Sequence, residues 1–255
     1  MSFKDWLFSN YPQNSTIEGQ WGALHIIVLV ACILSIIAIS ILFSKKRIHD
    51  DKYRRIVIIV LASLILFFEI TRRIINLIKT DTHTLHSLLV TLLPRPWCAI
   101  SCWMVMTAVL VNKKFFYNFA SITSILCGLI FFAYPGAGFN HKVILFENVY
   151  SIATHALFFT TAILFITLNF TDFKFKGMWK ELICLGGVYI YGAIETWILK
   201  IEKDPLYYLP NNEIMDIFGM KYLPFLIGYI LFIAVFWLSF YLVQNRKSLF
   251  KRCKK

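Results

Sequence analysis

The residues best suited to chemistry lie in an apolar run that contains "LLPRPWCAISCW", residues 92–103. Two prolines flank Arg95, and Cys98 follows within one turn. Pro94 and Pro96 have no backbone N–H, so they leave carbonyl groups one turn earlier without a donor and predict a break in the helix. A helix that restarts near Pro96 directs its first N–H groups toward Cys98, which favours an anion or a thiolate there.

Further ionisable side chains occur at comparable depth in the neighbouring apolar runs. A rise of about 1.5 Å per residue places Cys98 ~2 Å and Arg95 ~7 Å outside the midplane of a membrane, and the other groups lie roughly 3–9 Å outside it. Charged groups at this depth cost several kcal/mol unless they are paired or hydrated, so we expect them to share one polar cavity. The other groups are Glu69, Arg72, Arg73, His155 and Glu195, with His25 nearer the outer interface.

The arginines have a structural interpretation beside the functional one. Glu69 is spaced i,i+3 from Arg72 and i,i+4 from Arg73, so one helix can form its own ion pairs. Alternatively, Arg73 extends to the outer interface. Arg95 has no acid in its own run, so it needs Glu69 or Glu195 from another run, or an anionic ligand.

The elements that carry these residues are predicted to be transmembrane helices. Hydrophobic residues make up 58% of the 255 and aromatic residues 17%, far above a soluble domain. We therefore predict an all-α polytopic membrane helix bundle that forms a single domain over residues 1–255. Runs of about 18 or more mostly apolar residues can span a membrane, and seven such runs are predicted. They cover roughly residues 22–44, 56–78, 88–111, 119–134, 148–170, 182–199 and 221–243.

The distribution of basic residues predicts the orientation of the bundle. Of the 26 lysines and arginines, 17 fall in segments on one side of the predicted spans and six on the other, while Arg72, Arg73 and Arg95 lie within spans. Cytoplasmic loops retain basic residues, so we predict a protein of the cell membrane whose N-terminus lies outside the cell and whose C-terminus lies in the cytoplasm. This asymmetry also explains the net charge of +12, since basic segments attract anionic lipid at the cytoplasmic face. Nucleic-acid binding is not expected.

Several other function classes lack a motif. The chain has no CxxC pair, HExxH, Walker-type glycine loop or GxGxxG, so we expect neither a metal nor another cofactor. Five of the six cysteines fall within predicted spans, which argues against a disulfide scaffold. Nothing in the sequence specifies an oligomeric state.

A series of short motifs follows one order along most of the chain. They are "WGALHIIVL" with His25, "FFEI" with Glu69, "LPRPWC" ending at Cys98, "FAYPG" with Pro135, "ATHALFF" with His155, and "DPLYYLPNNEIMDIFG" over residues 204–219. In order and spacing the chain resembles the YwaF-like seven-helix membrane proteins, whose eukaryotic relatives are regarded as phospholipid acyltransferases. Two positions depart from the pattern: Pro96 replaces the histidine of the third motif, and no asparagine precedes Tyr207 and Tyr208.

The resemblance implies acyl transfer between membrane phospholipids through a cysteine intermediate. In that case Cys98 is the nucleophile, and His155, which lies at a similar depth, is the candidate base. Arg95 or the helix N-terminus would stabilise the oxyanion. The residues expected to bind substrate are Arg95, Glu69, Arg72, His25, Glu195, Tyr207 and Tyr208.

A different class of function also fits the basic cavity. A non-enzymatic lipid or anion binder, or a transporter, can use an outer-leaflet cavity lined by Arg and Glu between broken helices. The polar layer stops near the midplane, which disfavours a translocation route. A scaffold within a larger complex remains a third interpretation, and replacing Cys98 with serine distinguishes an enzyme from the other two.

Overall fold

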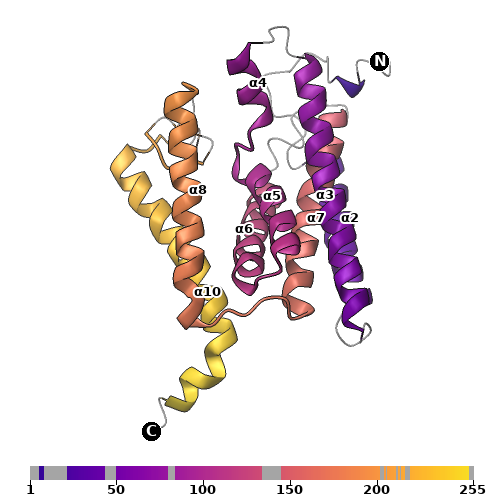
Figure 1. Ribbon diagram of the computed structural model, residues 1–255, viewed down its shortest axis with the longest axis vertical. Helices are drawn as coiled ribbons and strands as arrows, with labels where there is room; N and C mark the ends of the chain where they lie inside the picture. Colours follow the sequence, from indigo (N-terminus) through magenta and orange to yellow (C-terminus); the bar gives the residue numbers. More distant parts are fainter. Residues whose placement is uncertain are drawn as a thin grey trace.

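The computed structural model describes residues 6–8, 22–43, 50–79, 84–133, 145–201, 204, 206–210, 212, 214–215 and 219–252. Over these ranges the chain forms helices and no strand (Figure 1). The predicted all-α class is therefore confirmed.

Each predicted span corresponds to a helix or to a pair of helices. In chain order they are α2 (Ala23–Leu42), α3 (Asp51–Lys79), α4 (Leu85–Leu92) with α5 (Trp97–Val111), α6 (Lys114–Ala133), α7 (Phe146–Thr167), α8 (Met178–Ile198) and α10 (Tyr222–Arg252). A short 3-10 helix, η1 (Phe175–Gly177), leads into α8. The fourth span was expected to be short, at 119–134, but α6 begins at Lys114 and has 20 residues.

The described residues include five helices that are long and apolar enough to cross a membrane, namely α2, α6, α7, α8 and α10. The pair α4 and α5 provides a sixth span if its two helices, which are bent by 69°, are counted together. Helix α3 has 29 residues but carries Glu69, Arg72 and Arg73 in its second half. The count of seven spans remains a prediction that depends on α3.

The bend in the third span lies where the prolines predict it. Helix α4 ends at Leu92, and Pro96 is the N-cap residue of α5 with extended backbone angles (φ −67°, ψ 157°). At the other end of α5, Asn112 adopts the left-handed conformation (φ 53°), which reverses the chain before α6 begins at Lys114. The break and this reversal fix the position of α5 between α4 and α6.

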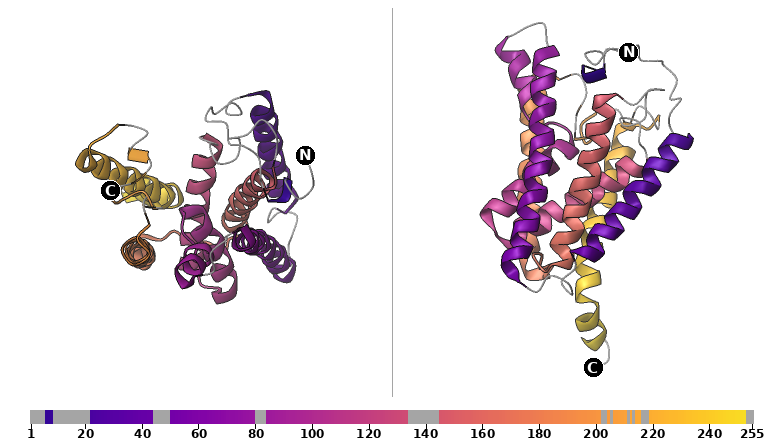
Figure 2. Two further views of the ribbon diagram at one scale, coloured as in Figure 1. Left: turned by 90° about the horizontal axis from the view of Figure 1, so that it is seen from above. Right: turned by 90° about the vertical axis from the view of Figure 1, so that its right-hand side faces the viewer.

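Helix α6 lies at the centre of the bundle. In Figure 2, α5 and α6 separate a group formed by α2, α3 and α7 from the pair α8 and α10. One side of α6 joins a core with α3, α5 and α7 that includes Ile65, Val105 and Phe158. Its other side packs Phe119 and Ile122 against residues of α10. In α6, 67% of the residues of the span are buried inside the protein, whereas in α2 the share is 11%. We therefore predict that α2 faces lipid.

The predicted orientation can be tested by thiol labelling. Helix α2 begins and α10 ends at opposite ends of the bundle, as an odd number of crossings requires (Figure 1). Cys253 lies outside the described residues and is predicted to be cytoplasmic. A membrane-impermeant maleimide added to intact cells should leave Cys253 unlabelled, while a cysteine at exposed Lys221 should react. Labelling of Cys253 before lysis would contradict the predicted orientation.

Candidate functional site

An arginine from α3 holds the break between α4 and α5. Arg73 Nη1 donates hydrogen bonds to the carbonyl oxygens of Thr91 (3.0 Å), Leu92 (2.6 Å) and Leu93 (2.7 Å). These carbonyls end α4, where the missing helical turn leaves them without backbone donors. The Arg73 side chain is therefore buried, at 4% exposure, and does not extend to the outer interface.

Glu69 balances two arginines of its own helix. Its carboxylate, 2% exposed, accepts hydrogen bonds from Arg72 Nε (3.2 Å) and Nη2 (2.9 Å) and from Arg73 Nη2. The i,i+3 and i,i+4 pairs expected from the spacing are both present. The Arg72 guanidinium also lies 5.6 Å from the centre of the Tyr150 ring. One carboxylate between two guanidinium groups leaves this part of α3 positively charged.

Arg95 has a different environment from the other two arginines. Within the described ranges it forms no hydrogen bond or ion pair, although it interacts electrostatically with Glu195 at longer range. Glu195 is 3% exposed, and its Oε1 accepts a hydrogen bond from the Tyr191 hydroxyl (2.7 Å). Its Oε2 is buried without a partner among the described residues. Of the partners expected for Arg95, neither Glu69 nor Glu195 forms an ion pair with it, which leaves the anionic ligand as a prediction.

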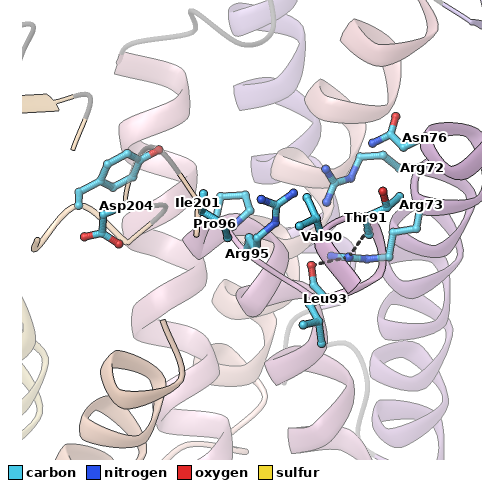
Figure 3. Close-up of a pocket in the computed structure, with 11 residues that line it drawn as sticks. Arg72, Arg73, Asn76, Val90, Thr91, Leu93, Arg95, Pro96, Ile201 and Asp204 are labelled. Carbon is cyan, nitrogen blue, oxygen red and sulfur yellow. Dashed lines mark hydrogen bonds between the residues drawn. The ribbon is translucent and has the colours of Figure 1, made fainter. Parts of the chain in front are cut away.

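The three arginines line one cavity of about 330 Å³. Its walls come from α3, from the break between α4 and α5, and from the segment that follows α8 (Figure 3). Arg95 lies between Asp204 on one side and Arg72 on the other. Of the six ionisable groups expected to share one polar cavity, Arg72, Arg73 and Arg95 line it, while Glu69, His155 and Glu195 do not.

The segment after α8 is ordered by Asp204. Its carboxylate accepts hydrogen bonds from three backbone N–H groups of the following turn, at 3.0, 2.6 and 2.7 Å. Of the two tyrosines expected to bind substrate, Tyr207 lines the cavity. Tyr208 instead donates its hydroxyl hydrogen bond to the Tyr189 carbonyl of α8 (2.6 Å).

Cys98 is the second residue of α5 and lies among the first N–H groups of that helix. Its thiol is within electrostatic range of Arg72 and Glu69, but Cys98 does not line the cavity. The preceding residue, Trp97, places its indole N–H 3.2 Å from both the Leu206 carbonyl and the Tyr229 hydroxyl. The turn that carries the thiol is thus tied to α10 and to the segment after α8.

The two candidate histidines, His25 and His155, do not line the cavity. His155 Nδ1 is 2.7 Å from the Ser151 carbonyl, which can only accept, so the neutral ring carries its proton on Nδ1 and a lone pair on Nε2. The ring stacks on Phe131 with centroids 3.9 Å apart. In the described part of the chain no hydrogen bond joins His155 to the Cys98 thiol. His25 is buried in the first turn of α2.

A second polar cluster lies at the opposite end of the bundle, where almost no ionisable group was expected. Glu181 of α8 is fully buried, and its carboxylate accepts hydrogen bonds from Asn118 Nδ2 (2.7 Å), Trp237 Nε1 (3.3 Å) and the Tyr241 hydroxyl. These donors come from α6 and α10, so one carboxylate joins three helices.

The sequence contained a signal for this cluster that was missed. The sixth span was predicted to begin at residue 182, which placed Glu181 in a loop, but α8 begins at Met178. Trp237 and Tyr241 are spaced i,i+4 and thus share one face of α10. No group of three His, Cys, Asp or Glu residues that could hold a metal ion occurs among the described residues.

Comparison with known proteins places the whole site in one family. Residues 20–243 match the TMEM164 family, so the match extends from the start of α2 to within α10. The chain belongs to the TMEM164 family. This is a family of transmembrane proteins, which agrees with the membrane-spanning helices. The cavity, Cys98 and His155 all lie within the region matched to TMEM164. No curated protein and no solved structure matches the chain.

Proposed function

We propose that the protein is a phospholipid acyltransferase of the cell membrane in which Cys98 carries the acyl group. The observation that carries the proposal is the position of this thiol in the first turn of α5, among the N–H groups that have no acceptor within the helix. A helix N-terminus favours a thiolate, while the Glu69 carboxylate offsets Arg72 and packing against the apolar core opposes the charge. The resemblance to YwaF-like proteins supports acyl transfer, and the basic cytoplasmic segments suit anionic lipid at the inner face.

The reaction consists of two acyl transfers. His155 takes the proton of the Cys98 thiol, the thiolate attacks an ester carbonyl of the donor phospholipid, the C–O bond breaks, and the lysophospholipid oxygen leaves with that proton. A hydroxyl group of the acceptor lipid then attacks the thioester and gives its proton to His155, which returns it to the Cys98 sulfur as the thiolate leaves. Each step exchanges one acyl bond for another and needs no cofactor.

His155 suits the role of base because its Nε2 is the nitrogen with the lone pair. In the resting structure it is not hydrogen-bonded to the thiol, so the thiol proton reaches His155 through a water molecule. The N–H groups at the start of α5 can serve as donors for the oxyanion.

The second candidate is a non-enzymatic binder or transporter of a lipid or another anion. The observation that favours it is Arg95, which lines the cavity without a protein partner among the described residues. Such a protein does not need a thiol, so its ligand binding should be unchanged when Cys98 is replaced by serine.

The acyltransferase proposal predicts a thioester on Cys98. Purified protein incubated with a phospholipid that bears an alkyne-tagged acyl chain should acquire a tag that neutral hydroxylamine removes. Cys98→Ser should acquire no hydroxylamine-sensitive tag, because serine is a poorer nucleophile and any oxygen ester formed on it would resist neutral hydroxylamine. Cys102→Ser is the matched control, since Cys102 is one turn further along α5 and buried in the core.

Two results would contradict this mechanism. One is a tag that persists in Cys98→Ser and remains sensitive to hydroxylamine. The other is a wild-type protein that acquires no tag from donors with different headgroups. Either result leaves the binder as the better description.

A further inference from the structure

The environment of Arg95 indicates that a ligand belongs to the cavity. A guanidinium has five N–H donors, and those of Arg95 meet no acceptor among the described residues. Two nearby acids are engaged elsewhere, Glu69 by two arginines and Asp204 by backbone N–H groups, while Glu195 is hydrogen-bonded to a tyrosine through one oxygen and interacts with Arg95 only at longer range. A cation at this depth is costly without an anion or water.

Arg73 provides a second and independent indication. It lines the same cavity at 4% exposure, and its Nε is buried without an acceptor in the described part of the chain. Arg72 lies on the same wall, and its side chain is 20% exposed although it pairs with Glu69. Donors thus converge on one space from α3 and from the break between α4 and α5 (Figure 3).

We propose that this cavity binds a phosphate group through Arg95 on one wall and Arg72 on the other. A phosphate presents at least two acceptor oxygens in different directions and can bridge guanidinium groups from separate elements. A carboxylate has two oxygens in one plane, and a single arginine can pair with both of them, as Arg72 does with Glu69.

The inference rests on the proposed function only for the source of the phosphate. A phospholipid headgroup and a soluble phosphate share the chemistry that the arginines recognise. If the headgroup is the source, the cavity holds the polar end of the lipid while its acyl ester lies nearer to Cys98.

The first experiment measures binding of inorganic phosphate to the purified protein in detergent, by isothermal titration at constant ionic strength with chloride as the reference salt. Wild type should bind phosphate, and Arg95→Gln should bind about tenfold more weakly or not at all, since a charge-assisted contact is lost. Arg54→Gln is the control, because Arg54 lies on α3 but pairs with exposed Asp51.

The second experiment distinguishes the sources. Native mass spectrometry should detect phosphatidylglycerol retained by wild type and by Arg54→Gln but not by Arg95→Gln, while diacylglycerol, which lacks the phosphate, is retained by none. Binding of inorganic phosphate without lipid retention assigns the site to a soluble phosphate. If Arg95→Gln fails to fold, Arg95→Lys replaces it, and its single ammonium should bind several-fold more weakly.

Equal phosphate and lipid binding by wild type and the Arg95 variants would overturn the proposal. Cys98→Ser separates this outcome from a failure of the acyltransferase mechanism. It should abolish the thioester and leave phosphate binding unchanged, so the two proposals can fail independently.

Discussion

Replacing Glu69 with glutamine is expected to lower the free energy of unfolding by about 3–5 kcal/mol, because it leaves buried cations uncompensated. The amide oxygen can still accept a hydrogen bond, but it no longer balances the charge of Arg72 and Arg73. Arg73 in turn holds the carbonyls at the end of α4, so the break should loosen as well. Unfolding in detergent by denaturant titration measures the loss.

Asp51→Asn is the matched control for this change. Asp51 pairs with Arg54 on the same helix at the same i,i+3 spacing as Glu69 and Arg72, but its side chain is 92% exposed. An exposed ion pair contributes at most about 1 kcal/mol. Equal stability of Glu69→Gln and Asp51→Asn would show that the Glu69 pairs do not stabilise the fold.

Replacing Glu181 with glutamine should have a comparable effect at the opposite end of the bundle. The carboxylate accepts hydrogen bonds from Asn118, Trp237 and Tyr241, and a side-chain amide would direct its own N–H groups at some of these donors. We expect a loss of roughly 2–4 kcal/mol, since each buried donor left without an acceptor costs about 1–3 kcal/mol.

The double variant with Tyr241→Phe tests the cause of this loss. Removing the tyrosine hydroxyl relieves one of the conflicts, so the double variant should be less destabilised than the sum of the single changes.

A local readout is the alkylation rate of Cys184, which lies half-buried on α8 beside the α6–α10 contact. This rate should rise when α8 separates from α6, while the rate for Cys127, buried in the core of α5, α6 and α7, should not. Strictly additive losses with an unchanged Cys184 rate would contradict the role given to Glu181.

Features that depend on neighbours in the sequence could be predicted from it. The apolar runs predicted the helices to within a few residues at most ends, and Pro94 and Pro96 predicted the break before α5. The spacing of Glu69 from Arg72 and Arg73 predicted their pairing, because residues three and four apart share a helix face. The common depth of six ionisable groups predicted a shared cavity, which the three arginines line but Glu69, His155 and Glu195 do not.

Features that depend on how the helices pack could not be predicted in this way. Arg73 reaches carbonyls 18–20 residues away, and depth along a helix does not say which neighbour it faces. For the same reason a similar depth did not establish contact between His155 and Cys98. Glu181 was assigned to a loop because the sixth span was predicted to begin at residue 182, and its partners, Asn118 and Trp237, lie on other helices. Which helices are adjacent is a tertiary property.

The hydrogen bonds between Arg73 and the end of α4 have a consequence for biosynthesis. Helix α3 emerges from the ribosome before α4, and its guanidinium groups are costly in lipid until acceptors are available. Glu69 provides some of these acceptors within α3, but the remaining ones for Arg73 follow only at Thr91, Leu92 and Leu93. The carbonyls at the break likewise need Arg73 before they can enter hydrocarbon. The smallest unit that can leave the translocation channel with these groups hydrogen-bonded is therefore the hairpin of α3 and α4. Neither helix satisfies them by itself.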